Sequence, residues 1–186
     1  AGATTFSNTG TVTFGNGGDT INFTGGVTAT VPSQVNIGGI VTSTNSNISI
    51  GDSNTPTVLI GDSTISGNTS GNITLGGTVN GAYTLDVNTT GTTTFSGIIG
   101  GSTPLTSVTT NTGGTVAINT TAISTTGAQT FNENVTLGAD VTLTSSSSGN
   151  ITFGGTPSGT WPISVTGNSA TADSATISLY VSSPDG

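Results

Sequence analysis

Carboxylates are the only strong acid–base and metal-binding groups in this chain of 186 residues. The sequence has 8 acidic residues and no Lys, Arg, His, Cys or Met. The chemistry left open is acid–base catalysis by paired carboxylates, or oxygen ligation of a hard cation such as Ca²⁺. The acidic residues are Asp19, Asp52, Asp62, Asp86, Glu133, Asp140, Asp173 and Asp185.

The missing residue types exclude many function classes. Without His or Cys there is no Ser-His-Asp triad, zinc–thiolate site, disulfide or redox thiol. Without Lys there is no P-loop, Schiff base or Lys–Asn isopeptide crosslink. The net charge of −8 cannot neutralise phosphates and is repelled by anionic membranes, so we expect no nucleic-acid or membrane partner.

Three aspartates are candidates for a calcium site, the one cofactor that the sequence leaves open. Asp19 lies in GNGGDTI (15–21), a partial and single match to the calcium-binding nonapeptide GGxGxDxUx. Asp52 and Asp62 lie in two copies of IGDS, at 50–53 and 60–63. The reading that we favour is a Gly-rich turn at Asp19 and Asx-type turns at Asp52 and Asp62. With two strands and two turns per coil of about twenty residues, the last two would lie on opposite edges.

Enzymatic activity is not expected. A glycosidase needs two carboxyl groups about 5–9.5 Å apart, and no basic residue is present to bind an acidic sugar. In a stack of coils of about twenty residues, a pair on adjacent coils would be about twenty positions apart. The pair that comes nearest to this spacing is Asp62 and Asp86.

The elements that must position these groups are short strands. Runs such as TVTF (11–14), TINF (20–23) and QVNI (34–37) are apolar at every second position and end near Gly or Asn. Thr suits the exposed row of such strands, and Val, Ile, Leu and Phe suit the buried row. We therefore predict an all-β protein.

Internal repetition predicts how the strands are arranged. The segment 71–88 returns at 149–166, which places Leu75 over Phe153, and TLGGTVNG (74–81) returns twenty residues later as TFSGIIGG (94–101). A repeat of about twenty residues, four of which make the longer period, predicts a β-solenoid in which Leu75 stacks on Phe95. The alternative is an antiparallel β-sandwich, because twenty residues also fit a hairpin.

We divide the chain into a β-rich region (1–70), the repeat region (71–167) and a C-terminal strand or tail (168–186). Within the repeat region, VNGAYTLDVNTTGTTTFSGIIGGSTPLTSVTT and TTGAQTFNENVTLGADVTLTSSSSGNITFGGT resemble the strand repeats of filamentous-haemagglutinin-like and autotransporter-like bacterial surface proteins. The resemblance covers about half of the chain. It implies a right-handed parallel β-solenoid stalk that is secreted and not catalytic.

A second, shorter resemblance lies near the C-terminus. GTWPISVTGNSATADSAT (159–176) is similar to phage tail-fibre shafts, in which a Trp-containing strand precedes a GNxATA-type segment. It implies a fibre that belongs to a virion and not to a cell.

Composition and resemblance together predict a non-enzymatic, extracellular structural protein, a subunit of a filament or adhesin stalk. We expect export after removal of a signal peptide, since Ala1-Gly2-Ala3 suits the residues after a small-residue cleavage site. The expected partner is a second copy of the chain, with a host-surface or extracellular-matrix ligand as a further possibility. Self-association is expected through edge strands, and its candidate residues are Thr4, Phe6, Ile177, Leu179 and Val181.

Overall fold

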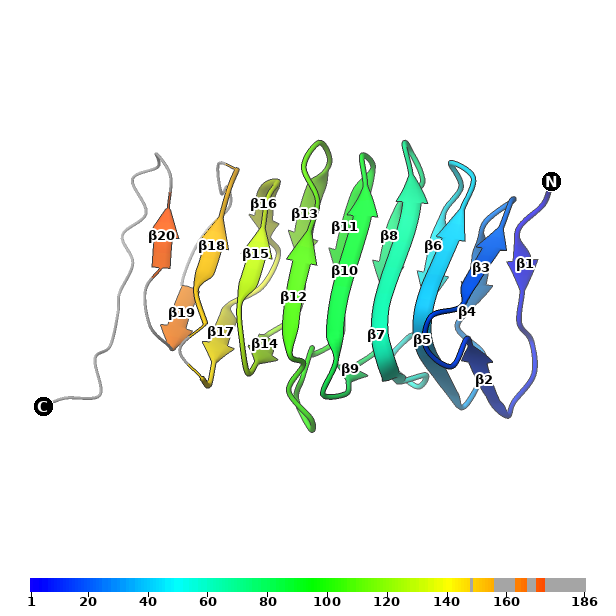
Figure 1. Cartoon of the computed structure of the whole chain (residues 1–186), viewed down its shortest axis with the longest axis horizontal. Helices are drawn as coiled ribbons and strands as arrows, with labels where there is room; N and C mark the ends of the chain where they lie inside the picture. The colour runs from blue at the N-terminus through cyan, green and yellow to red at the C-terminus, as the bar shows by residue number, and fades with distance from the viewer. Residues whose placement is uncertain (148, 156–162, 167–169, 173–186) are drawn as a thin grey trace, which may run out of the picture.

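The chain folds into a β-solenoid whose successive turns lie side by side along the long axis of the molecule (Figure 1). This computed structural model describes residues 1–147, 149–155, 163–166 and 170–172, the last two ranges as backbone only. Every regular element of the described residues is a strand. Within these ranges no helix has the length and apolar character to cross a membrane.

Three stacks of strands form the body, and each complete turn of the chain passes through them in order. The first stack contains β2 (Thr11–Phe14), the first part of β5 (Gln34–Ser43) and of β7 (Thr57–Asn68), β9 (Val79–Asn80), β14 (Ala122–Thr125), β17 (Val141–Ser145) and β19 (Ile163–Thr166). The second contains β3 (Thr20–Phe23), the rest of β5 and β7, β10 (Thr84–Thr89), β12 (Ser107–Thr110), β15 (Gln129–Phe131), β18 (Ile151–Phe153) and β20 (Ala170–Ala172). The third is a 7-stranded sheet of β1 (Thr4–Thr5), β4 (Val27–Ala29), β6 (Ile48–Ile50), β8 (Ile73–Leu75), β11 (Thr92–Phe95), β13 (Thr115–Ile118) and β16 (Asn134–Leu137).

All strand pairs of the described residues are parallel, which shows that the antiparallel sandwich is wrong. The predicted contact between Leu75 and Phe95 is confirmed, because the two residues are register partners on β8 and β11. Parallel pairing joins each residue to its equivalent one turn later, so like side chains lie over one another.

The longer repeat of 78 residues does not correspond to four turns, as the sequence had suggested. Leu75 belongs to the third stack, whereas its sequence equivalent Phe153 belongs to the second. Two features account for this difference. Each turn visits three strand positions and not two, and its length varies: Thr93 pairs with Ile73, 20 residues earlier, whereas Ile73 pairs with Ile48, 25 residues earlier.

The interior is a continuous column of apolar side chains with period-two burial along each strand. In β11 the order is half-buried, buried, half-buried, buried, so Phe95 is fully enclosed while Thr94 faces outward. The same alternation turns Thr93 inward, and Thr110 is likewise buried on β12. The prediction that Thr occupies the exposed row is thus right for most strands. It is wrong where a Thr lies two positions from a large buried apolar residue on the same strand, because the two side chains then share the inward face.

Replacement of a stacked core residue should destabilise the solenoid far more than replacement of its outward neighbour. We expect Phe95→Ala to cost about 3–5 kcal/mol, because it removes a buried ring and leaves a cavity between Leu75 and Ile118. The matched control Thr94→Ala should change the free energy of unfolding by less than about 0.5 kcal/mol. Thermal and denaturant unfolding followed by circular dichroism measures both, and equal losses in the two variants would contradict the assigned register.

Candidate functional site

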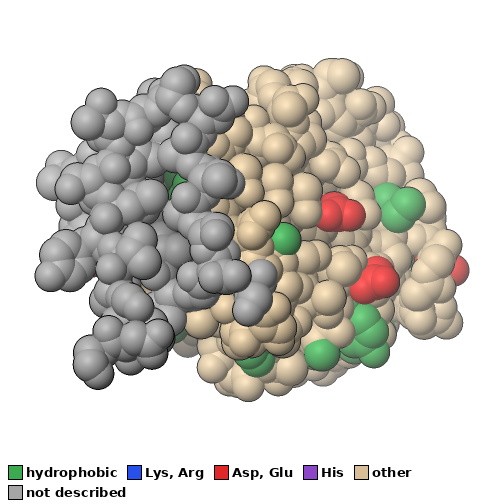
Figure 2. All heavy atoms as spheres, turned by 60° about the vertical axis from the view of Figure 1, so that its left-hand side comes forward, with side chains coloured by type: hydrophobic (Ala, Val, Ile, Leu, Met, Phe, Trp, Pro, Cys, Tyr) green, Lys and Arg blue, Asp and Glu red, His purple; other side chains and the backbone are tan. Residues whose placement is uncertain are grey.

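The described carboxylates are spread along the solenoid, and no three of them gather in a group that could hold a metal ion. The face drawn in Figure 2 is mostly polar and uncharged, with separate carboxylates and small apolar areas. Asp173 and Asp185 lie outside the described residues.

Asp52 caps a tight turn between β6 and β7. Its Oδ1 accepts hydrogen bonds from the backbone N–H groups of Asn54 (2.8 Å) and Thr55 (2.9 Å). Thr55 in turn donates from its hydroxyl to the carbonyl groups of Thr30 and Pro32, one turn earlier. The predicted Asx-type turn is confirmed at this position.

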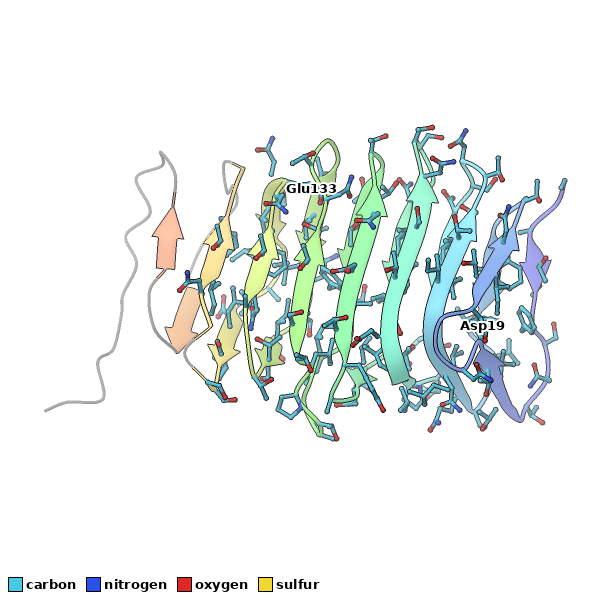
Figure 3. All side chains as sticks on the ribbon, in the orientation of Figure 1. Asp19 and Glu133 are labelled. Atoms are coloured by element: carbon cyan, nitrogen blue, oxygen red, sulfur yellow. The ribbon has the colours of Figure 1, made fainter. Side chains whose placement is uncertain are left out.

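Asp19 and Asp62 also accept backbone hydrogen bonds, each in its own way. Asp19 lies in the Gly-rich turn between β2 and β3, near the N-terminal end in Figure 3, and its Oδ2 accepts the N–H of Asn16 (3.0 Å). Asp62 lies within β7, where its Oδ1 accepts the N–H of Thr84 on the next turn (3.0 Å). The Asx turn predicted at Asp62 is therefore wrong, because a long strand and not a turn contains its IGDS copy. Asp52 lies between β6 and β7, and Asp62 lies where β7 passes from the first stack to the second, so the two aspartates occupy different corners of the turn.

Asp62 and Asp86, the pair whose spacing came nearest to one turn, do lie on adjacent strands. Asp86 on β10 lies opposite Thr64 on β7, two residues after Asp62. The two aspartates are thus diagonal neighbours on the outward side of the second stack.

Glu133 is the acidic residue that sequence reasoning did not single out, and it is the only one described as buried. Its side chain is 3% exposed, and neither carboxyl oxygen makes a hydrogen bond of regular geometry, although the Thr110 hydroxyl and the Gly114 N–H lie close enough to affect it. It lies in the turn between β15 and β16, at the edge of the molecule that is uppermost in Figure 3. Desolvation by burial raises the pKa of this carboxyl, against a smaller lowering effect from the neighbouring Thr110 hydroxyl and Gly114 N–H.

A sequence signal for this burial did exist. Phe131, Glu133 and Val135 alternate across the β15–β16 turn, and all three are buried. Because side chains two positions apart share a face in extended chain, the parity of Glu133 with its apolar neighbours predicted an inward carboxyl.

The N-terminal end of the solenoid contains the described part of the predicted self-association surface. Thr4 is exposed on β1, and Phe6 is half-buried. The Phe6 ring packs edge-on against Phe14 (5.1 Å between ring centroids) and Phe23 (6.0 Å). Phe6 therefore closes the end of the apolar column. The other three candidates lie outside the described residues: Ile177, Leu179 and Val181.

Comparisons with protein-family models, with curated proteins and with solved structures give no match. A function must therefore be argued from the geometry of the solenoid: the strand edges at its N-terminal end, its polar sides and the buried carboxyl.

Removal of the Asp52 carboxylate tests its role as a turn cap against a role in calcium binding. We expect Asp52→Ala to lower the free energy of unfolding by about 1–2 kcal/mol, since two backbone donors lose a charged acceptor. The loss should be the same with millimolar calcium and with a chelator, as measured by thermal unfolding. Asp140→Ala, at an exposed position, is the control. Calcium-dependent stability that disappears only in the Asp52 variant would contradict the turn-cap role.

Proposed function

We propose that the chain is a non-enzymatic, extracellular structural protein, a subunit of a surface filament or adhesin stalk that self-assembles through strand pairing. The observation that carries the proposal is the in-register parallel stacking of all three strand positions. A body of this kind resists bending, because each turn is joined to the next by main-chain hydrogen bonds on several sides.

The sides of the solenoid support a role as a shaft. Outward positions carry short polar side chains, for example Thr74, Thr94 and Thr136 in the third stack. The net charge of −8 with no side-chain cation gives copies no ion pair through which to adhere sideways. Lateral contact is therefore disfavoured, and contact along the axis is favoured.

The first turn supports association along the axis. Among the described strands β1 pairs only with β4, and β2 and β3 pair only with β5. Thr4 and Phe6 donate their N–H groups to the carbonyls of Gly26 and Thr28, both 2.9 Å away. Successive N–H groups of a strand point to opposite sides, so the N–H of Thr5 points to the outer edge of β1.

Strand addition to this edge would be a heterologous contact, in which one surface of a copy meets a different surface of the next. Contacts of this type form open filaments unless the rotation closes into a ring. Main-chain pairing would supply affinity, and the apolar residues Ile177, Leu179 and Val181 would supply register by entering the next copy. The distal end of such a shaft would then be the part that meets a ligand on a host surface or in the extracellular matrix.

A single substitution at the outer edge of β1 tests this assembly. Thr5→Pro removes the outward N–H but leaves the hydrogen bonds of Thr4 and Phe6 to β4, so the subunit should fold and fail to polymerise. Thr5→Ala keeps the N–H and should polymerise like the parent chain. Light scattering and electron microscopy measure the outcome. Polymers of normal length from a folded Thr5→Pro chain would contradict pairing at this edge.

Deletion of residues 176–186 tests the donor segment. We expect the shortened chain to keep its circular dichroism spectrum and to remain monomeric, because the edge of β1 would have no strand to accept. Filaments formed without this segment would refute strand donation, and a monodisperse monomer of the intact chain would refute self-assembly. Trimers wound about one axis in the images would favour the phage tail-fibre shaft instead.

A further inference from the structure

Glu133 occupies a row that is otherwise lined by glycine over four neighbouring turns. A methyl group added to Gly91 would lie 3.1 Å from the Gly71 carbonyl oxygen, and one added to Gly114 would lie 2.3 Å from that of Gly91. On the far side, a methyl on Gly155 would lie 2.4 Å from the backbone of Glu133. The turn corner before the third stack is thus too tight for a side chain, yet one turn carries a glutamate there.

The glutamate fits because its carboxyl uses space that Gly114 leaves free. A methyl on Gly114 would lie 2.8 Å from Glu133 Oε1 and 2.8 Å from the carbonyl oxygen of Thr89. The free space at Gly114 therefore borders both the Glu133 carboxyl and the carbonyl groups of Thr89 and Gly91, which lie one turn before Gly114. The hydroxyl of Thr110 on β12 is also buried there without a hydrogen-bond partner.

The surroundings of this carboxyl contain carbonyl oxygens, the Thr110 hydroxyl and the Gly114 N–H, but no cation among the described residues. A charged carboxylate among carbonyl oxygens is strongly disfavoured unless a counter-charge is present. The chain has no Lys, Arg or His in its whole length, so a proton or an ion from solution must neutralise the group. Because the corner is closely packed, the smaller occupant fits it best.

We propose that the Glu133 corner is a buried proton-binding site that makes the stacking of the turns around β12, β13, β15 and β16 sensitive to pH. In the protonated state the carboxyl is neutral and can donate its O–H to a neighbouring carbonyl or hydroxyl oxygen. In the ionised state it must regain water, which opens the corner between Gly114 and Gly155.

The direction of the pH effect follows from the cause. Burial raises the pKa of Glu133 above the ordinary value of a glutamate, so the folded chain binds a proton that the unfolded chain has already released. The free energy of unfolding therefore falls as the pH rises from the ordinary pKa of glutamate, which applies to the unfolded chain, to the raised pKa of the folded chain. Above the raised pKa it stays low. A pH below the raised pKa tightens this part of the stack, and a pH above it loosens the stack.

Among the described residues, no other charged group produces the effect. Burial raises the pKa of Glu133, and the Thr110 hydroxyl and the Gly114 N–H lower it by less. None of these three contributions comes from a charged group. The elements against the carboxyl contribute the Thr89–Gly91 turn after β10, Thr110 on β12, Gly114 before β13 and Gly155 after β18. None of these residues titrates.

Direct titration tests the proton site. Glu133 is the only glutamate of the 186-residue chain, so labelling with δ-¹³C-glutamate gives a single carboxyl resonance by NMR. We expect its titration midpoint in the folded chain to lie above the midpoint of the same sample in denaturant. Equal midpoints would overturn the proposal. A folded-state resonance that shifts on addition of calcium at constant pH would also overturn it, in favour of a metal ion.

Hydrogen exchange tests the coupling to the stack. After correction for the intrinsic rate, peptides that cover 107–118 and 129–137 should lose protection as pH rises through the titration midpoint measured by NMR, while 27–50 should not. Glu133→Gln keeps the size of the side chain without the charge and should abolish the difference, whereas Asp140→Asn should retain it. The same pH dependence in Glu133→Gln as in the parent chain would overturn the proposal. If Glu133→Gln does not fold, the titration of the parent chain decides.

Discussion

Parallel main-chain hydrogen bonding between consecutive turns is the interaction on which the rest of this structure depends. It joins each strand to its equivalents before and after it, as in the series β8, β11, β13 and β16. Because the bonds are made by the backbone, the fold tolerates a sequence that consists largely of Thr, Gly, Ser and Asn. The side chains only have to satisfy one condition, that alternate positions are small or apolar enough to enter a narrow interior.

That condition explains the polar residues inside the solenoid as well as the apolar ones. Gln129 is fully buried on β15, and its Nε2 donates to the carbonyls of Ile123 (3.1 Å) and Thr144 (2.9 Å). It thereby joins its own turn, to which Ile123 belongs, to the next turn, which contains Thr144. Ser63 plays a similar part on β7, where its hydroxyl donates to the Ile37 carbonyl, 3.2 Å away. Gln129 and Ser63 thus reach backbone carbonyls, whereas other inward polar atoms, among them the hydroxyl of Thr93 and the carboxyl oxygens of Glu133, are buried without a regular hydrogen bond. Glu133 differs from the buried Thr residues because its side chain can carry a charge.

The chain has no side-chain cation, and three of its described carboxylates accept backbone N–H groups instead. Asp19, Asp52 and Asp62 each accept at least one N–H group. Such bonds stabilise the turns and the contacts between turns without a counter-ion. For Glu133 the donors are insufficient, and burial then raises its pKa.

The sequence by itself determined the class of fold, the alternation of buried and exposed positions, and the stacking of Leu75 on Phe95. Period-two patterning follows from extended strands, and a local repeat of twenty residues places equivalent residues over one another in consecutive parallel turns. It did not determine the number of strands per turn or the register of the longer repeat. Turn corners lengthen and shorten without changing the strands, so Leu75 and Phe153 share a sequence context and occupy different stacks. Parity could have placed Glu133 inside. Only the tertiary structure decided that its neighbours would be glycines and carbonyl oxygens, because Gly114 and Gly155 come from the preceding and following turns.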